Sequence, residues 1–369
     1  MTTTPDRVAM VSPYALSVPG GVQSQVRGMA RDLAGRGIDV VVCSPGTQDP
    51  SLVDAGVAHV AVGGVLAVPA NGSRAPVTLS PSASRTFASV ASTLRGGVVH
   101  VHEPFAPIAA YGILRAHRRP VVATFHRGGG GPAYVAGRSV IKRLAAGIDV
   151  ATAVSEHAAA TIADAAGITT EVLFNGFEID RISAATACPT EAPTVLFVGR
   201  HEPRKGLATL LEAFSSIPLP IECWVLGDGP QTAALRRQYD ADRRISWLGA
   251  LGDDDKFSRM KGADVLCVPS MGGESFGLVP LEGMAAGTAV VASDIPGYRE
   301  ATAGNATLVA PGDADALAVA LRHAIEHPAA KKALDAARAH AAHWSIHSLV
   351  TSYLELYEKA AAHFDTLVR

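Results

Sequence analysis

Short apolar runs recur along the whole chain and alternate with stretches in which apolar residues return every three or four positions. Continuous runs rich in Val, Ile and Ala, separated by helical periods, are typical of parallel strands that helices cover on both faces. The runs fall into two series, which begin at residues 7, 38, 98, 120, 149 and 171, and then at residues 194, 221, 244, 263, 288 and 306. The pattern therefore predicts an α/β protein with two successive doubly wound parallel sheets.

A segment without a clear period separates the two series. It covers residues 176–193 and contains two prolines, which is typical of a linker. We predict a first domain over residues 1–178 and a second over residues 179–351. The helical pattern over residues 352–369 has no strand after it, and we expect this helix to cross back to the first domain. Ligands of such sheets bind beyond the carboxyl ends of the strands, so we expect the domains to face each other across a cleft.

Size and composition narrow the class of protein. The chain has 369 residues, 48% of them hydrophobic and 18% charged, and no apolar run of the roughly eighteen residues that span a bilayer. Its start lacks the basic and apolar segments of a signal peptide, so we expect a cytoplasmic protein with reduced cysteines. A net charge of −2 excludes the strongly basic class of nucleic-acid-binding proteins.

Two strand-end loops carry residue types that bind phosphate. Gly20 and Gly21 precede a predicted helix, whose first N–H groups can approach an anion, although a simple tight turn is the alternative because the spacing is not G-x-G-x-x-G. Cations beside a predicted helix start suit a diphosphate, and a solvated charged loop is the alternative. The loop after residues 194–198 carries four charged side chains: Arg200, Glu202, Arg204 and Lys205.

Histidines stand at the ends of two predicted strands of the first series. His126 ends the run PVVATFH and precedes RGGGG, so it can orient or polarise a hydroxyl group, although a purely structural histidine is the alternative. His102 has the same two readings. The Glu103-Pro104 pair that follows it does not form an H-E-x-x-H metal site.

Glu274 and Glu282 stand among glycines and small apolar residues in GGESFGLVPLEGMAAG. Carboxylates in such surroundings need polar partners, because an unpaired buried charge is very unfavourable. We expect hydroxyl groups of a bound ligand to supply them. The remaining acidic clusters stand at predicted helix starts, where they complement the helix dipole, so we expect no metal and no cofactor.

These stretches together resemble the family 4 retaining glycosyltransferases of the GT-B fold. The resemblance rests on the E-x7-E motif formed by Glu274 and Glu282, and on VPGGVQSQV, VGRHEPRKG and EGMAAGTAVVASDIPGYRE, and it covers nearly the whole chain. PYALSVPGGVQSQV, HEPFAP, VATFH and GGESFG are most similar to the bacterial enzymes of this family that transfer mannose from GDP-mannose to phosphatidylinositol. The resemblance implies two Rossmann-like domains, an acceptor-binding one and a nucleotide-sugar-binding one, and peripheral association with the inner membrane face.

The resemblance also implies roles for individual residues. Glu274 would hold the sugar hydroxyls and Glu282 the ribose, while Arg200 and Lys205 would stabilise the departing diphosphate during front-side attack. Catalytic roles fall to His126, Arg200, Lys205 and Glu274. Donor contacts fall to Gly21, Arg200, Lys205, Leu251, Asp253, Glu274, Phe276, Gly277, Leu278 and Glu282. Acceptor contacts fall to Tyr14, Gln23, Asn71, Ser73, His126 and Glu202.

Two alternatives stay open. Residues 82–95 carry only two basic side chains, few for docking on anionic lipid, although Arg115, Arg118 and Arg119 add to them. One alternative is therefore a transferase that uses another nucleotide sugar, such as a UDP-linked one, on a soluble or polyprenyl acceptor. The other is a GT-B protein that binds a nucleotide sugar without catalysis, against which the complete set of charged motif residues argues.

Overall fold

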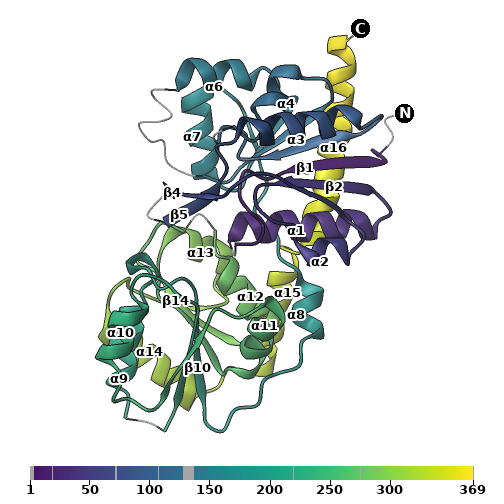
Figure 1. Cartoon of the computed structure of the whole chain (residues 1–369). Coiled ribbons are helices and arrows are strands. Elements are labelled where there is room, and N and C mark those ends of the chain that lie inside the picture. The colour runs from purple at the N-terminus through teal and green to yellow at the C-terminus, as the bar shows by residue number, and fades with distance from the viewer. Residues whose placement is uncertain are drawn as a thin grey trace. The chain divides into compact units, whose positions relative to one another are not determined.

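The computed structural model of the chain describes residues 4–18, 20–70, 73–106, 108–127, 137–218, 220–274 and 276–368 (Figure 1). The chain divides into two compact units. The first consists of Met1–Phe177 together with Ile346–Arg369, and the second of Glu178–Ser345. Across the described residues, no helix combines the length and the apolarity that crossing a membrane requires.

The first unit is built on a parallel sheet with the strand order β3-β2-β1-β6-β7-β8-β9. Its strands are β1 (Arg7–Val11), β2 (Asp39–Ser44), β3 (Ala58–Ala61), β6 (Val98–His102), β7 (Val121–Phe125), β8 (Val150–Ala153) and β9 (Glu171–Val172). Its helices are α1 (Gly21–Gly35), α2 (Pro50–Val53), α3 (Pro81–Thr93), α4 (Tyr111–Ala116), α6 (Arg138–Ala145), α7 (Glu156–Ala166) and α16 (Ile346–Val368).

A β-hairpin of the first unit was not predicted. It consists of β4 (Leu66–Ala70) and β5 (Ser73–Val77), which pair antiparallel outside the main sheet. The backbone N–H of Ala15 donates to the carbonyl of Pro76 at 2.9 Å, and Tyr14 forms an isolated bridge with Val77. The hairpin is thereby tied to the loop that follows β1.

The C-terminal helix α16 packs on the first unit, as the sequence predicts, and begins at Ile346 (Figure 1). Leu349, Val350, Leu356 and Ala360 join the core formed by α1 and one face of the sheet. On β6, β7 and β8 this sheet face is apolar at the amino ends of the strands and becomes polar further along them, where it presents His100, His102, Thr124 and Thr152. Two buried tyrosines of α16 meet these polar groups, so the helix is held by both apolar contacts and hydrogen bonds.

The second unit repeats the architecture with the strand order β12-β11-β10-β13-β14-β15, all parallel. Its strands are β10 (Thr194–Val198), β11 (Glu222–Leu226), β12 (Ile245–Gly249), β13 (Val265–Val268), β14 (Ala289–Ser293) and β15 (Thr307–Val309). Its helices are α8 (Ile179–Ala184), the 3₁₀ turn η1 (Pro203–Lys205), α9 (Leu207–Ser215), α10 (Thr232–Gln238), α11 (Asp253–Gly262), α12 (Leu278–Ala286), α13 (Pro296–Thr302), α14 (Ala314–Glu326) and α15 (Lys331–Ala342).

Each sheet has one point at which the strand order reverses direction. In the first unit this point lies between β1 and β6, and in the second between β10 and β13. Loops that leave neighbouring strands there run to opposite faces of the sheet, which opens a crevice in which ligands of doubly wound folds bind. The paired glycines, Arg200 and Glu274 follow β1, β10 and β13, His102 ends β6, and His126 follows the adjacent strand β7.

Candidate functional site

The loop after β10 is shaped by one glycine. Gly206 has φ +71°, a left-handed conformation that glycine adopts without strain, and it separates η1 from α9. A Cβ at this position would lie 1.8 Å from the carbonyl oxygen of Pro269, which follows β13. The backbone N–H of Met271 also donates to the carbonyl of Arg204 at 2.8 Å. The two loops at the reversal point are thus held in direct contact.

This contact brings together five charged side chains. Arg204 Nη1 and Lys205 Nζ both donate to Glu274 Oε1, at 2.9 and 2.7 Å. Glu202 is 4% exposed and accepts from Arg200 Nε at 2.8 Å and from Arg204 Nε at 3.1 Å. Arg200 is the most exposed of the five, with 46% of its side chain accessible. We refer to Arg200, Glu202, Arg204, Lys205 and Glu274 as the charged cluster.

Aromatic side chains pack beneath the charged cluster. Tyr298 of α13 is buried, and its hydroxyl lies 2.8 Å from Ser270 Oγ. Burial raises the pKa of Tyr298, and the negative charge of Glu274 raises it further. Phe276 is buried and meets the Trp344 ring edge-on at 4.8 Å between centroids. Phe276 and Gly277 lead into α12, so the first N–H groups of this helix lie directly after Glu274 in the chain.

Glu282 lies on α12 and is paired within the chain as well. Lys256 Nζ lies 2.9 Å from Glu282 Oε1 and 3.5 Å from Asp253 Oδ1, and Arg181 Nη1 lies 3.4 Å from Asp253 Oδ2. Burial would lower the pKa of Lys256, but the two carboxylates outweigh it and raise the pKa above its ordinary value. Leu251 is half-buried shortly before α11. Glu282 and Asp253 are therefore linked through one lysine.

Both glutamates of the E-x7-E motif thus have cationic partners in the protein itself. The sequence led us to expect that ligand hydroxyls would satisfy them, and this expectation was incomplete. Lys256 was missed altogether, although its position three residues after Asp253 on a predicted helix is a spacing at which side chains meet. Arg204 was noted only as part of a charged loop, and nothing in the sequence indicates that it reaches Glu274.

The loop after β1 presents a different kind of surface in the first unit. Gly21 is exposed at the first position of α1, and a Cβ built on it meets no atom within 4 Å. Gln23 is buried and lies against Gly20, where a Cβ would come within 3 Å of its side-chain amide. Tyr14 is half-buried beside the β4–β5 hairpin. Ser73 begins β5, and Asn71 lies outside the described residues.

Three histidines and a glutamate occupy the carboxyl ends of β6 and β7. His102 Nδ1 lies 2.9 Å from His126 Nε2, and the rings of His100 and His102 stack at 4.3 Å between centroids. Glu103 is buried at φ +47°, and its carboxylate accepts the backbone N–H of His126. We refer to His100, His102, Glu103 and His126 as the histidine cluster.

Burial controls protonation in the histidine cluster. It lowers the pKa of His126 to about 3, and together with the neighbouring His126 it lowers the pKa of His100 to about 3. The pKa of His102 is lowered well below its ordinary value, first by burial and then by the two adjacent histidines. Burial also raises the pKa of Glu103 to about 7, although N–H groups of His126 and Arg127 oppose the shift. The three rings are therefore neutral near pH 7.

Helix α16 supplies hydrogen-bond partners for the histidine cluster and for the threonines beside it. Tyr357 Oη lies 2.9 Å from His100 Nδ1, and Thr124 Oγ1 lies 2.7 Å from His100 Nε2. Tyr353 Oη lies 2.8 Å from Thr124 Oγ1 and 3.0 Å from Thr152 Oγ1. Each buried hydroxyl and each nitrogen of His100 thus has a partner, as buried polar groups require.

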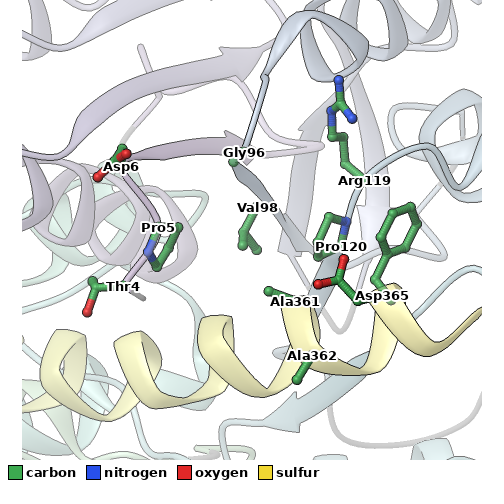
Figure 2. A pocket seen from close by; sticks show the side chains of 12 residues that line it. Thr4, Pro5, Asp6, Gly96, Val98, Arg119, Pro120, Ala361, Ala362 and Asp365 are labelled. Atoms are coloured by element: carbon green, nitrogen blue, oxygen red, sulfur yellow. The ribbon is translucent and has the colours of Figure 1, made fainter. Parts of the chain in front are cut away.

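A cavity of about 500 Å³ lies in the first unit away from these loops. It lies beside the amino ends of β1, β6 and β7 under the last turns of α16, lined by Asp6, Val98, Pro120 and Asp365 among others (Figure 2). Its lining contains none of the residues that the sequence singled out for the donor or for catalysis. Within the described ranges, no group of three or more His, Cys, Asp or Glu side chains is arranged to hold a metal ion.

Comparison with protein families assigns both halves of the chain. The family described as "Glycosyltransferase Family 4" matches residues 19–181, and the one described as "Glycosyl transferases group 1" matches residues 178–341. The two matches together run from the loop after β1 to the last turn of α15.

Individual proteins agree with this assignment. The phosphatidyl-myo-inositol mannosyltransferase of Mycolicibacterium smegmatis is 35% identical over 366 residues, which cover 95% of this chain and 93% of that protein. The GDP-mannose-dependent alpha-(1-6)-phosphatidylinositol monomannoside mannosyltransferase of Mycobacterium tuberculosis is 31% identical over 228 residues, which cover 55% of this chain and 59% of that protein. A glycosyltransferase structure from Rickettsia africae shares the fold, with a TM-score of 0.77 at 19% identity over 96% of this chain and 98% of that one.

Proposed function

Because the chain belongs to the family 4 glycosyltransferases of the GT-B fold, we propose that it transfers mannose from GDP-mannose to a phosphatidylinositol-type lipid at the cytoplasmic face of the membrane. The chain is a hexosyltransferase, and the proposal concerns its donor, its acceptor and its stereochemistry. One observation carries it: a relative that aligns over 95% of the chain is named for mannosyl transfer to phosphatidyl-myo-inositol.

The charged cluster supports a nucleotide-diphosphate donor in the second unit. Arg200 and Lys205 lie at the reversal point of the sheet, where Arg can bind a phosphate through two parallel hydrogen bonds and Lys acts as a compact charge. Glu274 accepts sugar hydroxyls in this proposal, and the N–H groups that lead into α12 at Phe276, Gly277 and Leu278 face the transferred group. Gly21 of the first unit leaves room for a phosphate at the start of α1.

The linked carboxylates of the second unit support recognition of the nucleoside. Glu282 accepts the ribose hydroxyls in this proposal, and Leu251 and Asp253 contact the base. Lys256 holds Glu282 in place through an ion pair that is only slightly exposed. An ionised acceptor makes stronger hydrogen bonds to hydroxyl groups than a neutral one does.

We further propose that the reaction retains the anomeric configuration by front-side attack. The acceptor hydroxyl bonds to the anomeric carbon on the side from which the diphosphate departs, and its proton passes to a diphosphate oxygen. Arg200 and Lys205 stabilise the charge that develops on the leaving group. His126 contacts the acceptor with Tyr14, Gln23, Asn71 and Ser73, while Glu202 holds the arginines of the charged cluster. Arg200 and Lys205 supply the positive charge that the departing diphosphate needs, so the proposal includes no metal.

Helix α6 supports docking on an anionic membrane. Arg138, Lys142 and Arg143 are exposed on this helix, which contains no acidic residue and also exposes Val140. Helix α4 packs against α6 and adds the exposed Arg115. Basic side chains near an anionic surface contribute about 1 kcal/mol each, so this face compensates for the few basic residues of α3.

The docking surface is tested by replacing Arg138, Lys142 and Arg143 with serine. Loss of three cations is expected to weaken binding to vesicles that contain phosphatidylinositol by about a hundredfold. The matched control removes three exposed cations of the second unit: Arg236, Arg237 and Arg243. Equal loss in both triple variants would mean that net charge, rather than the α6 face, governs binding.

The activity is tested by offering radiolabelled GDP-mannose, UDP-glucose and UDP-galactose with phosphatidylinositol vesicles. We expect label in lipid from GDP-mannose alone, an α-linked product, and full activity in EDTA. Label from a UDP-sugar, or label only in a water-soluble product, would replace the proposed donor or acceptor. Binding of GDP in a thermal-shift assay without any turnover would instead indicate a non-catalytic protein.

A further inference from the structure

His102 and His126 are brought together by the pairing of two neighbouring strands. His102 is the last residue of β6 and lies opposite Thr124 of β7, and His126 follows two residues later. The rings stack with centroids 5.2 Å apart, and His102 Nδ1 lies 2.9 Å from His126 Nε2. One of these nitrogens must donate and the other must accept, so exactly one proton occupies the contact when both rings are neutral.

The shared proton can be placed in two ways, and each determines the other nitrogen of His126. If His102 donates, His126 must carry its own proton on Nδ1. If His126 donates from Nε2, its Nδ1 is a bare lone pair and His102 must carry its proton on Nε2. Both rings are neutral near pH 7 because burial lowers their pKa values.

The positions of the two rings in the fold distinguish the two arrangements. His102 Nε2 and His126 Nδ1 are both buried, and neither has a hydrogen-bond partner among the described residues. His102 is fully buried, whereas His126 is half-buried where β7 ends. An unpaired buried N–H group is rarer in proteins than an under-satisfied acceptor. A ligand can supply the missing acceptor only at the partly exposed His126 ring, so the favourable arrangement places the N–H on His126 Nδ1 and the bare lone pair on His102 Nε2.

We propose that His102 sets the tautomer of His126, so that His126 offers an Nδ1–H donor to a substrate oxygen and does not act as a base. This inference rests on the proposed function for the identity of the substrate. His102 is a positioning residue, because it acts only through His126. Glu103 complements it by accepting the backbone N–H of His126, which fixes the main chain while His102 fixes the ring.

The tautomer is measured directly in the full-length protein with ¹⁵N-labelled histidine. We expect the side-chain ¹⁵N spectrum of the wild type to show His126 protonated on Nδ1, with the signal assigned by its loss in His126→Gln. In His102→Phe a ring remains but the donor is removed, so the His126 proton is expected to move to Nε2. Protonation of wild-type His126 on Nε2 would overturn the proposal, even if the variant failed to fold.

A matched control separates positioning from general destabilisation. Tyr357→Phe removes the partner of His100 Nδ1 and leaves the His102–His126 contact untouched. We expect it to lower the thermal stability and to leave the tautomer of His126 unchanged. If the His126 proton stayed on Nδ1 in His102→Phe, or also moved in Tyr357→Phe, the assigned role of His102 would be contradicted.

Activity supplies an independent readout. If His126 donates to the acceptor lipid, His102→Phe should lower kcat/KM for the lipid at least about fivefold, the effect of one lost hydrogen bond, and leave KM for GDP-mannose unchanged. If the tautomer of His126 changes in His102→Phe but the wild type transfers no mannose, the proposed function is refuted and the inference stands. If the wild type transfers mannose but the tautomer of His126 is unchanged in His102→Phe, the inference is refuted and the proposed function stands.

Discussion

The two units share a topology but place opposite kinds of chemistry at the carboxyl ends of their central strands. The charged cluster of the second unit joins cations and carboxylates that remain partly accessible to water. The histidine cluster of the first unit is more deeply buried, and its rings are neutral. A fold that fixes where a ligand binds therefore leaves the electrostatic character of the site to a few loop residues.

This difference fits the proposed division of labour. A diphosphate leaving group needs positive charge that is already oriented, and the ion pairs with Glu202 and Glu274 hold three cations in place. An acceptor hydroxyl needs oriented hydrogen bonds and little charge, which neutral imidazole rings provide. Variants that change one unit at a time test this difference.

The largest effect is expected from Lys205→Ala. Arg204 still pairs with Glu274 in this variant, so the carboxylate keeps a partner while the site loses one positive charge. We expect kcat for mannosyl transfer to fall about a hundredfold, the usual effect of removing one preorganised electrostatic group. Lys359→Ala, which breaks an exposed pair with Glu171 in the first unit, should leave kcat unchanged. Turnover near the wild-type rate in Lys205→Ala would show that Lys205 does not stabilise the departing diphosphate.

The next largest effect is expected on the stability of the first unit at low pH. The pKa of His100 is about 3 in the folded protein against an ordinary value of 6.5. Above pH 6.5 neither state is protonated, whereas below it the unfolded chain binds a proton that the folded one does not, and stability is lost toward pH 3. The pKa of Glu103 is raised to about 7, so between pH 4.5 and pH 7 the folded protein holds a proton that the unfolded chain has lost. The contribution of Glu103 to folding stability is therefore present at low pH and is lost as the pH rises toward 7.

We therefore expect His100→Asn to be less sensitive to acid than the wild type. Between pH 7 and pH 5 the wild type should lose about 2 kcal/mol more than the variant, the amount that one histidine with this shift contributes. Hydrogen exchange of peptides from the first unit measures this loss. All three tryptophans lie in the second unit, so their fluorescence serves as the control and should not distinguish the two proteins.

A smaller effect is expected from Glu202→Gln. The amide still fills the buried position but accepts less strongly from Arg200 and Arg204, so both guanidinium groups become less well oriented. We expect kcat to fall about tenfold, which corresponds to about 1.4 kcal/mol. Glu326→Gln, at an exposed pair with Arg322, is the matched control. A change in KM for the lipid alone would instead assign Glu202 to acceptor binding.

The smallest effect is expected where charge is fully hydrated. Arg7 and Asp39 pair at 3.0 Å, and about half or more of each side chain is exposed. Exposed pairs of this kind contribute little to stability, because water and salt screen them. Arg7→Ala should change the unfolding free energy by less than about 0.5 kcal/mol in a urea titration. A loss above 1 kcal/mol would show that exposure is a poor guide to the worth of ion pairs in this chain.

The sequence predicted those features that follow from local patterns. All twelve apolar runs form parallel strands, because an uninterrupted run is buried on both faces of a sheet. Strand β3 and the β4–β5 hairpin were missed, because a histidine, an arginine and two prolines interrupt the apolar positions of these short strands. The boundaries drawn from the pattern also placed the start of the last helix at 352, whereas α16 begins at Ile346.

The contacts within the two clusters could not be predicted, because they depend on register and strand order. His102 meets His126 only because β6 and β7 are neighbours with His102 opposite Thr124. Glu274 meets Lys205 only because β10 lies beside β13 and Gly206 allows the close approach of their loops. The residue types were visible in the sequence, whereas their partners required the three-dimensional arrangement.

Helix α16 has a consequence for the order in which the protein is made. A ribosome synthesises the strands of the first unit before the second unit, but Tyr353, Tyr357 and the apolar residues that cover one face of its sheet emerge only after the entire second unit. Until then the polar groups of His100 and Thr124 have no tyrosine hydroxyl to bind. The first unit therefore completes its interior only after the whole second unit has been translated.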